Sequence, residues 1–336
     1  MTDIPDVTFV IAAYNSAGTV VRAIDSALAQ KGVAVEVVVV DDASTDDTRE
    51  VVAAIADPRV RLVALPRNSG PGGARNAGLE IARGHWVAIL DSDDTVEPDR
   101  LARLIARATR AGAQIAVDNL EVVAADGSRT RMFAEAELER QTLLTLPAFI
   151  ASNVLFRSEH NFGYMKPVFA RSFLVEHGLR FDQSLSIGED YILLASALAR
   201  GGRCVVEPVA GYVYHVREGS ISRVLRKHHV EAMILSDQRF VVDHSLGPAA
   251  TAAQRRRTRS LNEAYSFLSL VEHLKNGALA RALRTAIADP AALRHLRMPI
   301  AARLRRLVRG GRAARRAGAS AAGSTISGRG PHSSKG

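Results

Sequence analysis

The chain begins with short apolar runs that alternate with segments of helical periodicity. Four apolar runs, each with β-branched residues and a polar end, occupy residues 7–13, 35–40, 60–65 and 86–90. Between and after them, apolar residues recur at helical spacing and predict helices over residues 19–30, 47–56, 74–83 and 98–111. Strands that alternate with helices in this way predict an α/β fold with a mostly parallel central sheet flanked by helices.

The pattern becomes less regular after residue 114. It predicts a strand over 115–124, helices over 168–177 and 189–200, and strands over 203–215 that are interrupted at Pro208 and Gly211. We expect residues 130–166 to be irregular with some helix. Residues 223–290 are mainly helical in pattern, so the sequence predicts a helical C-terminal extension after a larger domain over residues 1–222.

The positive charge of the chain lies in its C-terminal part. The net charge is +9, but residues 291–336 contain eleven Lys or Arg and no Asp or Glu. Removing these eleven from the 44 basic residues leaves 33 against 35 acidic ones, so the rest of the chain is nearly neutral. Residues 291–309 predict a basic amphipathic helix, and residues 310–336, rich in Gly, Ser, Ala and Arg, predict a disordered basic tail.

The basic helix suits the surface of an anionic membrane. A helix packed on the domain with a solvated basic face is the alternative. Nucleic-acid binding is not expected, because no aromatic residue follows Phe267 and no nucleic-acid recognition motif is visible. The N-terminus has no signal-peptide pattern, no apolar run is long enough to cross a bilayer, and Cys204 is the one cysteine. These features predict a cytoplasmic protein, peripheral at the inner face of the cell membrane.

Three of the predicted strands end in polar clusters, which should converge because the carboxyl ends of parallel strands share one edge of the sheet. The clusters are Tyr14-Asn15, Asp41-Asp42 and the sequence Asp91-Ser92-Asp93-Asp94. Two carboxylates at spacing two suit a divalent cation that carries substrate phosphates, although an acidic turn before a helix is the alternative. The chain lacks the G-x-G-x-x-G and Walker motifs, which argues against a dehydrogenase or an ATPase.

Five motifs in one order resemble glycosyltransferase family 2, the inverting enzymes with the GT-A nucleotide-diphospho-sugar transferase fold. They are I-x-x-Y-N, V-V-D-D-A-S-T-D, G-G-A-R-N-x-G, L-D-S-D-D and G-E-D-Y, and the resemblance covers about residues 7–222. Within the family, the segments FDQSLSIGEDYILLASAL and YVYHVREGSIS are most similar to bacterial exopolysaccharide glucosyltransferases of the succinoglycan type.

The resemblance implies a role for each matching residue. For the nucleotide-sugar donor, it implies binding by Ala13, Tyr14, Asn15, Asp42, Arg75, Asn76, Asp91, Glu189 and Arg217. Among these, the Tyr14 ring would lie against the base, Asp42 would read the uracil, and Asp91 would be the ribose-side acid.

For the reaction itself, the resemblance implies that Asp190 is the catalytic base, since a sugar hydroxyl needs a carboxylate to take its proton. Mn²⁺ or Mg²⁺ would be held by Asp93, with Asp91 and His215 as further candidate ligands. Asp94 matches no fixed role, and we expect it to cap the next helix.

The implied function is inverting transfer of a hexose, glucose from UDP-glucose, to a hydroxyl of a growing, lipid-linked oligosaccharide in bacterial exopolysaccharide biosynthesis, with a β-linkage as product. Two alternatives are a catalytically inactive sugar-nucleotide-binding protein and a sugar nucleotidyltransferase. Intact Asp91, Asp93 and Asp190 argue against the first, and the absence of a glycine-rich motif with Arg and Lys after the first strand argues against the second. The donor sugar, the acceptor, the linkage position, the metal preference and the oligomeric state stay open.

Overall fold

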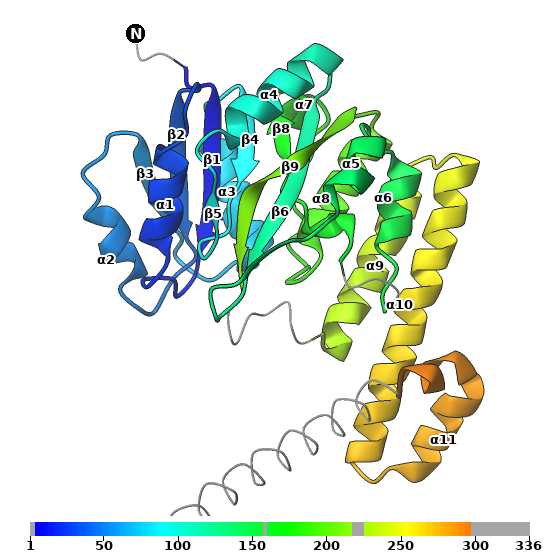
Figure 1. Cartoon of the computed structure of the whole chain (residues 1–336). Coiled ribbons are helices and arrows are strands. Elements are labelled where there is room, and N and C mark those ends of the chain that lie inside the picture. The colour runs from blue at the N-terminus through cyan, green and yellow to red at the C-terminus, as the bar shows by residue number, and fades with distance from the viewer. Residues whose placement is uncertain (1–3, 157–159, 217–224, 297–336) are drawn as a thin grey trace, which may run out of the picture. The chain divides into compact units, whose positions relative to one another are not determined.

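One mixed sheet of nine strands organises the first part of the molecule (Figure 1). The computed structural model describes residues 4–156, 160–216 and 225–296. The chain forms two compact units, residues 1–265 and residues 266–336. The sheet and all residues of the candidate site that the structure describes belong to the first unit.

The N-terminal strands form the parallel half of the sheet, in the order β3-β2-β1-β4. Their bounds are Val7–Ala13 for β1, Val35–Asp41 for β2, Val60–Ala64 for β3 and Trp86–Ile89 for β4. All residues of β1 except one, and all of β2, are buried, because helices cover both faces of a parallel sheet. The predicted α/β architecture is confirmed.

Helices pack on the two faces of this array because successive strand residues point in opposite directions. Val37 and Val39 share a core with Val20 and Ile24 of α1, while Val38 and Val40 pack against α3. The helices here are α1 (Val20–Leu28), α2 (Thr48–Ala53), α3 (Gly70–Ile81) and α4 (Arg100–Ala111).

The second half of the sheet mixes directions and continues in the order β8-β6-β9-β5 beside β4, with β7 paired to β6. Its strands are β5 (Thr95–Val96), β6 (Ile115–Val123), β7 (Arg129–Arg131), β8 (Val168–Ala170) and β9 (Cys204–His215). The pair β6 and β9 is parallel, whereas β8 is antiparallel to both of its neighbours.

The helix predicted over residues 168–177 is wrong in its first third. Residues 168–170 form β8, which fills the gap between β4 and β6, and α7 (Arg171–Glu176) begins only afterwards. A short apolar run satisfies either structure locally, and here hydrogen bonding to two neighbouring strands decides the outcome.

Residues 204–215 form one strand instead of the interrupted strands that we predicted. Pro208 and Gly211 lie where the register between β6 and β9 shifts, so a bulge absorbs them. Glycine is required at 211, because a Cβ there would stand 2.6 Å from Cγ of Arg100 and from Oδ2 of Asp118. The bulge therefore makes room for a buried ion pair.

The remaining elements are helical. In the segment 130–166 they are α5 (Glu135–Arg140), α6 (Leu146–Ser152) and the 3-10 turn η1 (Phe162–Tyr164). Later helices are α8 (Glu189–Ala199), α9 (Lys227–Asp243), α10 (Pro248–Lys275), α11 (Leu279–Ala288) and the 3-10 segment η3 (Pro290–Leu296). Within the described ranges, no helix combines the length and the apolar character needed to span a bilayer.

The predicted basic helix over 291–309 is described only in its first six residues, which continue η3. The rest of that segment, and the predicted tail over 310–336, lie outside the described residues.

Candidate active site

The polar ends of the parallel strands meet as the sequence predicted. Asn15 lies two residues beyond the end of β1, and its side-chain oxygen accepts hydrogen bonds from the backbone N–H of Thr45 at 2.8 Å and from the Thr45 hydroxyl at 3.2 Å. The hydroxyls of Ser16 and Ser92 are 2.9 Å apart, which joins the loop after β1 to the acidic loop after β4. The three predicted clusters therefore form one edge.

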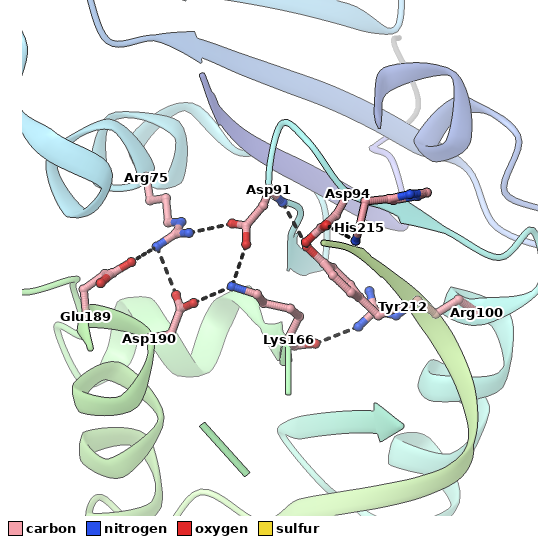
Figure 2. Close-up of polar contacts among 9 residues, drawn as sticks. All are labelled: Arg75, Asp91, Asp94, Arg100, Lys166, Glu189, Asp190, Tyr212 and His215. Atoms are coloured by element: carbon pink, nitrogen blue, oxygen red, sulfur yellow. Dashed lines mark hydrogen bonds and ion pairs between the residues drawn. The ribbon is translucent and has the colours of Figure 1, made fainter. Parts of the chain in front are cut away.

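Five charged side chains meet at the centre of this edge (Figure 2). Arg75 comes from α3, Asp91 follows β4, Lys166 precedes β8, and Glu189 and Asp190 occupy the first turn of α8. We call these five residues the charge cluster. Elements far apart along the chain bring it together, and four of its five members were predicted as site residues.

The two cations of the charge cluster bridge its three carboxylates. Nη1 of Arg75 lies 2.5 Å from Oε1 of Glu189 and 3.1 Å from Oδ1 of Asp190, and Nη2 lies 2.6 Å from Oδ1 of Asp91. Nζ of Lys166 lies 2.8 Å from Oδ2 of Asp91 and 2.6 Å from Oδ2 of Asp190. Formally, the cluster carries one excess negative charge.

The pKa values in the cluster reflect this pairing. Burial disfavours the ionised form of Asp91, but the charges of Lys166 and Arg75 outweigh it and hold the pKa of Asp91 well below its usual value. Burial also acts against the ammonium of Lys166, yet Asp190 and Asp91 raise its pKa above the ordinary range. At neutral pH the two groups are therefore an ion pair. Burial raises the pKa of Glu189, although Arg75 opposes this.

A second, buried network lies beside Asp91. The Tyr212 hydroxyl accepts a hydrogen bond from the backbone N–H of Asp91 at 3.2 Å and donates to Oδ2 of Asp94 at 2.8 Å (Figure 2). The other oxygen of Asp94 accepts from the backbone N–H of His215, also at 2.8 Å. Burial, together with the charges of Asp91 and Asp93, raises the pKa of Asp94 well above its usual value.

The expectation that Asp94 caps the next helix is wrong, because Asp99 occupies the N-cap position of α4. Asp94 is 1% exposed and ties the acidic loop to the end of β9. Local sequence could not show this, since Tyr212 and His215 lie more than a hundred residues away.

Lys166 is held in place by a fully buried ion pair. Arg100 donates from Nε and Nη2 to the two oxygens of Asp118 at 2.9 and 2.8 Å, and Nη2 also donates to the carbonyl of Lys166 at 2.6 Å. The guanidinium carbon of Arg100 lies 5.3 Å from the ring centroid of Tyr212. One arginine thus supports both the lysine of the charge cluster and the tyrosine beside it.

The first turn of α8 is fixed by the residue that follows Asp190. The Tyr191 ring stacks on Phe149 with centroids 5.2 Å apart, and the guanidinium carbon of Arg257 lies 3.6 Å from the Tyr191 centroid. Carboxylates in the first turn of a helix are also favoured by the helix dipole. The position of Asp190 is therefore determined by packing as well as by its ion pairs.

Two predicted donor-binding residues have contacts of different kinds. Both polar groups of the Asn76 amide bind the backbone of Phe181, at 2.9 and 2.8 Å, so Asn76 anchors the segment that leads to α8. Asp42 is 3% exposed and accepts from the backbone N–H of Ser69 at 2.7 Å. Burial raises the pKa of Asp42 despite that hydrogen bond.

Tyr14, by contrast, is 48% exposed although it is a large aromatic residue. Its neighbours Ala13, at the end of β1, and Asn15 complete the predicted first motif. Asn15 has a φ of 50°, in the left-handed region that asparagine tolerates better than most residues. That conformation turns the chain sharply just beyond the sheet. Arg217, also predicted to bind the donor, lies outside the described residues.

The predicted metal ligands do not form a cluster of protein side chains. Among the described residues, no three His, Cys, Asp or Glu side chains are grouped as metal ligands would be. Each oxygen of Asp91 contacts a cation, and Nε2 of His215 lies 3.0 Å from the hydroxyl of Thr95. Asp93 lies partly exposed in the acidic loop. Mg²⁺ commonly uses one or two carboxylates together with substrate phosphates, so Asp93 fits an ion that arrives with a diphosphate.

Sequence reasoning missed Lys166. It lies in the segment 130–166, where no motif stood out, and a single lysine is usually a solvated surface residue. One signal was available, since only five of the 44 basic residues are lysines and this one stands between Met165 and Pro167.

The comparisons with known proteins agree with this geometry. Residues 8–173 match the model of the family "Glycosyl transferase family 2". The succinoglycan biosynthesis protein ExoO of Rhizobium meliloti is 70% identical over 304 residues, which cover 90% of this chain and 87% of that protein.

Two solved structures share the fold at low sequence identity. TarS of S. aureus, residues 1–349 with UDP-GlcNAc, aligns with a TM-score of 0.60 at 20% identity and covers 83% of this chain and 89% of that chain. The mannosyltransferase PcManGT from Pyrobaculum calidifontis, in complex with GDP-Man and Mn²⁺, aligns with a TM-score of 0.57 at 21% identity and covers 90% and 81%. The fold is therefore GT-A, and the chain belongs to glycosyltransferase family 2.

Proposed function

We propose that this protein is an inverting hexosyltransferase that acts in the synthesis of a bacterial exopolysaccharide. It moves a hexose, glucose from UDP-glucose, to a hydroxyl of a growing, lipid-linked oligosaccharide and forms a β-linkage. The observation that carries this proposal is the charge cluster, which joins the predicted base Asp190 to Asp91 through Arg75 and Lys166 at the edge of the sheet. The name of the R. meliloti relative supports the assignment to polysaccharide synthesis.

Asp190 is the base in this mechanism. Its carboxylate takes the proton of the acceptor hydroxyl while that oxygen attacks the anomeric carbon of the donor. The bond between this carbon and the diphosphate oxygen breaks, and the nucleoside diphosphate leaves with the electron pair. Attack from the opposite face inverts the anomeric centre, so an α-linked donor yields a β-linked product.

Arg75 and Lys166 have two roles in the proposed mechanism. They keep three carboxylates together at a site that must also accept an anionic donor, and they offer positive charge to its diphosphate. Both oxygens of Asp190 now contact these cations. When the diphosphate of the donor binds Lys166 and Arg75, it competes with the carboxylate of Asp190 for these cations and frees that carboxylate to contact the acceptor hydroxyl.

We further propose that Mn²⁺ or Mg²⁺ assists the reaction. Asp93 would hold the ion together with oxygens of the diphosphate, with Asp91 and His215 nearby, and the ion would offset negative charge on the leaving group. The uracil of the donor would lie against the exposed ring of Tyr14, and its polar groups would face the buried carboxylate of Asp42.

The function is tested by measuring nucleoside diphosphate release from a panel of sugar nucleotides, with added Mg²⁺, with added Mn²⁺ and with EDTA. We expect release from one donor, stimulated by a divalent cation and lost with EDTA. Absence of binding to every sugar nucleotide would refute the proposed donor class. Equal release with EDTA and with metal would refute the metal requirement alone.

Replacing Lys166 by methionine should lower kcat/KM for the donor by about 10- to 100-fold, the effect of losing a charged hydrogen bond. Methionine keeps the apolar stem and removes the ammonium, so Asp91 and Asp190 lose one of the two cations that bridge them, and Arg75 alone remains. Lys31→Met is a matched control, because Lys31 is an exposed lysine far from the cluster in sequence. A value within twofold of wild type for the Lys166 variant would show that the ammonium is dispensable.

A further inference from the structure

The second unit exposes a row of large apolar side chains on one helix. In α11, Leu279, Leu283 and Ile287 are 69%, 62% and 70% exposed. They follow one another at spacing four, so they lie on one face. Ala282, on another side of the helix, is 4% exposed. We call the three exposed residues the α11 stripe.

The second unit has a strongly positive net charge. Residues 266–336 contain fourteen Lys or Arg and two acidic residues, Glu272 and Asp289. The first unit therefore has 30 basic against 33 acidic residues, so its net charge is slightly negative. Helix α11 itself contains Arg281 and Arg284 and no acid, and both arginines are exposed. Arg284 follows Leu283 directly and stands beside the stripe.

The exposed apolar stripe and the positive net charge of the unit together limit the kinds of partner that can bind the stripe. Single exposed apolar residues are ordinary, but three in a row on one helical face mark a contact surface. A second copy of this unit would bring twelve net positive charges against twelve, which opposes self-association. A helix with an exposed apolar face, an arginine at the border of that face and a strongly basic unit around it is the pattern of elements that lie in a membrane interface.

We propose that α11 binds the surface of an anionic membrane. The α11 stripe would enter the boundary between headgroups and acyl chains, and Arg284, at the border of the stripe, would lie at the level of the anionic headgroups. Arg281 lies on the opposite face of the helix, because successive residues turn by about 100°, and adds to the positive charge of the unit. The inference rests on the proposed function in one respect: if the acceptor is lipid-linked, membrane binding by α11 would bring the enzyme to the surface that holds its acceptor.

The test uses the full chain and sedimentation with vesicles of phosphatidylcholine, with and without about 30 mol% phosphatidylglycerol. The variant Leu279→Asp/Leu283→Asp/Ile287→Asp is compared with Val175→Asp/Leu235→Asp/Val242→Asp, three exposed apolar residues of the first unit. About 0.5 M salt screens the attraction of the basic residues and isolates the apolar contribution.

We expect the wild type and the control variant to bind the anionic vesicles, and the stripe variant to bind about tenfold or more weakly in high salt. Three outcomes overturn the proposal. They are equal binding by the stripe variant at both salt concentrations, no vesicle binding by the wild type, and a wild-type dimer that the stripe variant converts to a monomer. Nucleoside diphosphate release without vesicles tests the proposed function separately, because the stripe is not part of the charge cluster.

Discussion

Replacing Asp190 by asparagine is expected to lower kcat by about 10²- to 10⁴-fold, the usual contribution of a general base. Asparagine has nearly the same shape but cannot accept a proton from the acceptor hydroxyl. The substitution leaves two cations, Arg75 and Lys166, against two carboxylates, Asp91 and Glu189. Because the remaining charges balance, the variant should fold and bind the donor.

Two measurements test this prediction together: the affinity for the donor, by calorimetry, and the rate of transfer at saturating donor. Asp126→Asn serves as the control, because Asp126 is an exposed carboxylate in the turn between β6 and β7. Retained donor affinity with the rate lost supports Asp190 as the base. A rate near that of wild type would move the role to another group, and loss of donor binding would assign Asp190 to donor recognition instead.

Replacing Asp118 by alanine should lower the free energy of unfolding by about 3–5 kcal/mol, because it leaves the charge of Arg100 buried without its partner. The side chains of Arg100 and Asp118 are 0% and 1% exposed and share two hydrogen bonds. Urea unfolding, with the midpoint compared at unchanged slope, measures the loss.

Glu121→Ala is the matched control, since Glu121 lies on the same strand, β6, but pairs with the exposed side chains of Arg129 and Arg131. Exposed ion pairs contribute about 0–1 kcal/mol, so this variant should be close to wild type. Equal losses in the free energy of unfolding for the two variants would show that the contribution of the Arg100–Asp118 pair does not depend on its burial.

The Asp118→Ala substitution should also reduce the rate of sugar transfer, since Arg100 binds the carbonyl of Lys166 and packs on Tyr212. Measuring the transfer rate at low temperature, where the variant is still folded, separates this effect from the loss of stability. This coupling explains why the charge cluster depends on residues that carry no motif of their own.

Much of the architecture follows from local pattern. The buried strands β1, β2 and β4 were predicted within about one residue, because a continuous apolar run with β-branched residues and a polar end is typical of a buried strand in a parallel sheet. Strand order then places the three polar ends at one edge, so Asn15, Asp42 and Asp91 could be expected together.

The short elements could not be predicted in the same way. Strand β8 has three residues and exists because β4 and β6 supply its hydrogen bonds on both sides. The bulge in β9 depends on the register with β6, which no local window contains. In both places a partner distant in the sequence decides the backbone conformation.

The sequence by itself determined the fold class, the family motifs and the candidacy of Arg75, Asp91, Glu189 and Asp190, since each belongs to a motif whose spacing is local. Only the tertiary structure brought in Lys166, the Tyr212–Asp94 network and the Arg100–Asp118 pair. The physical reason is that burial and charge pairing depend on which segments meet in space, and a charged residue within the sequence looks the same whether it is solvated or holds two carboxylates together.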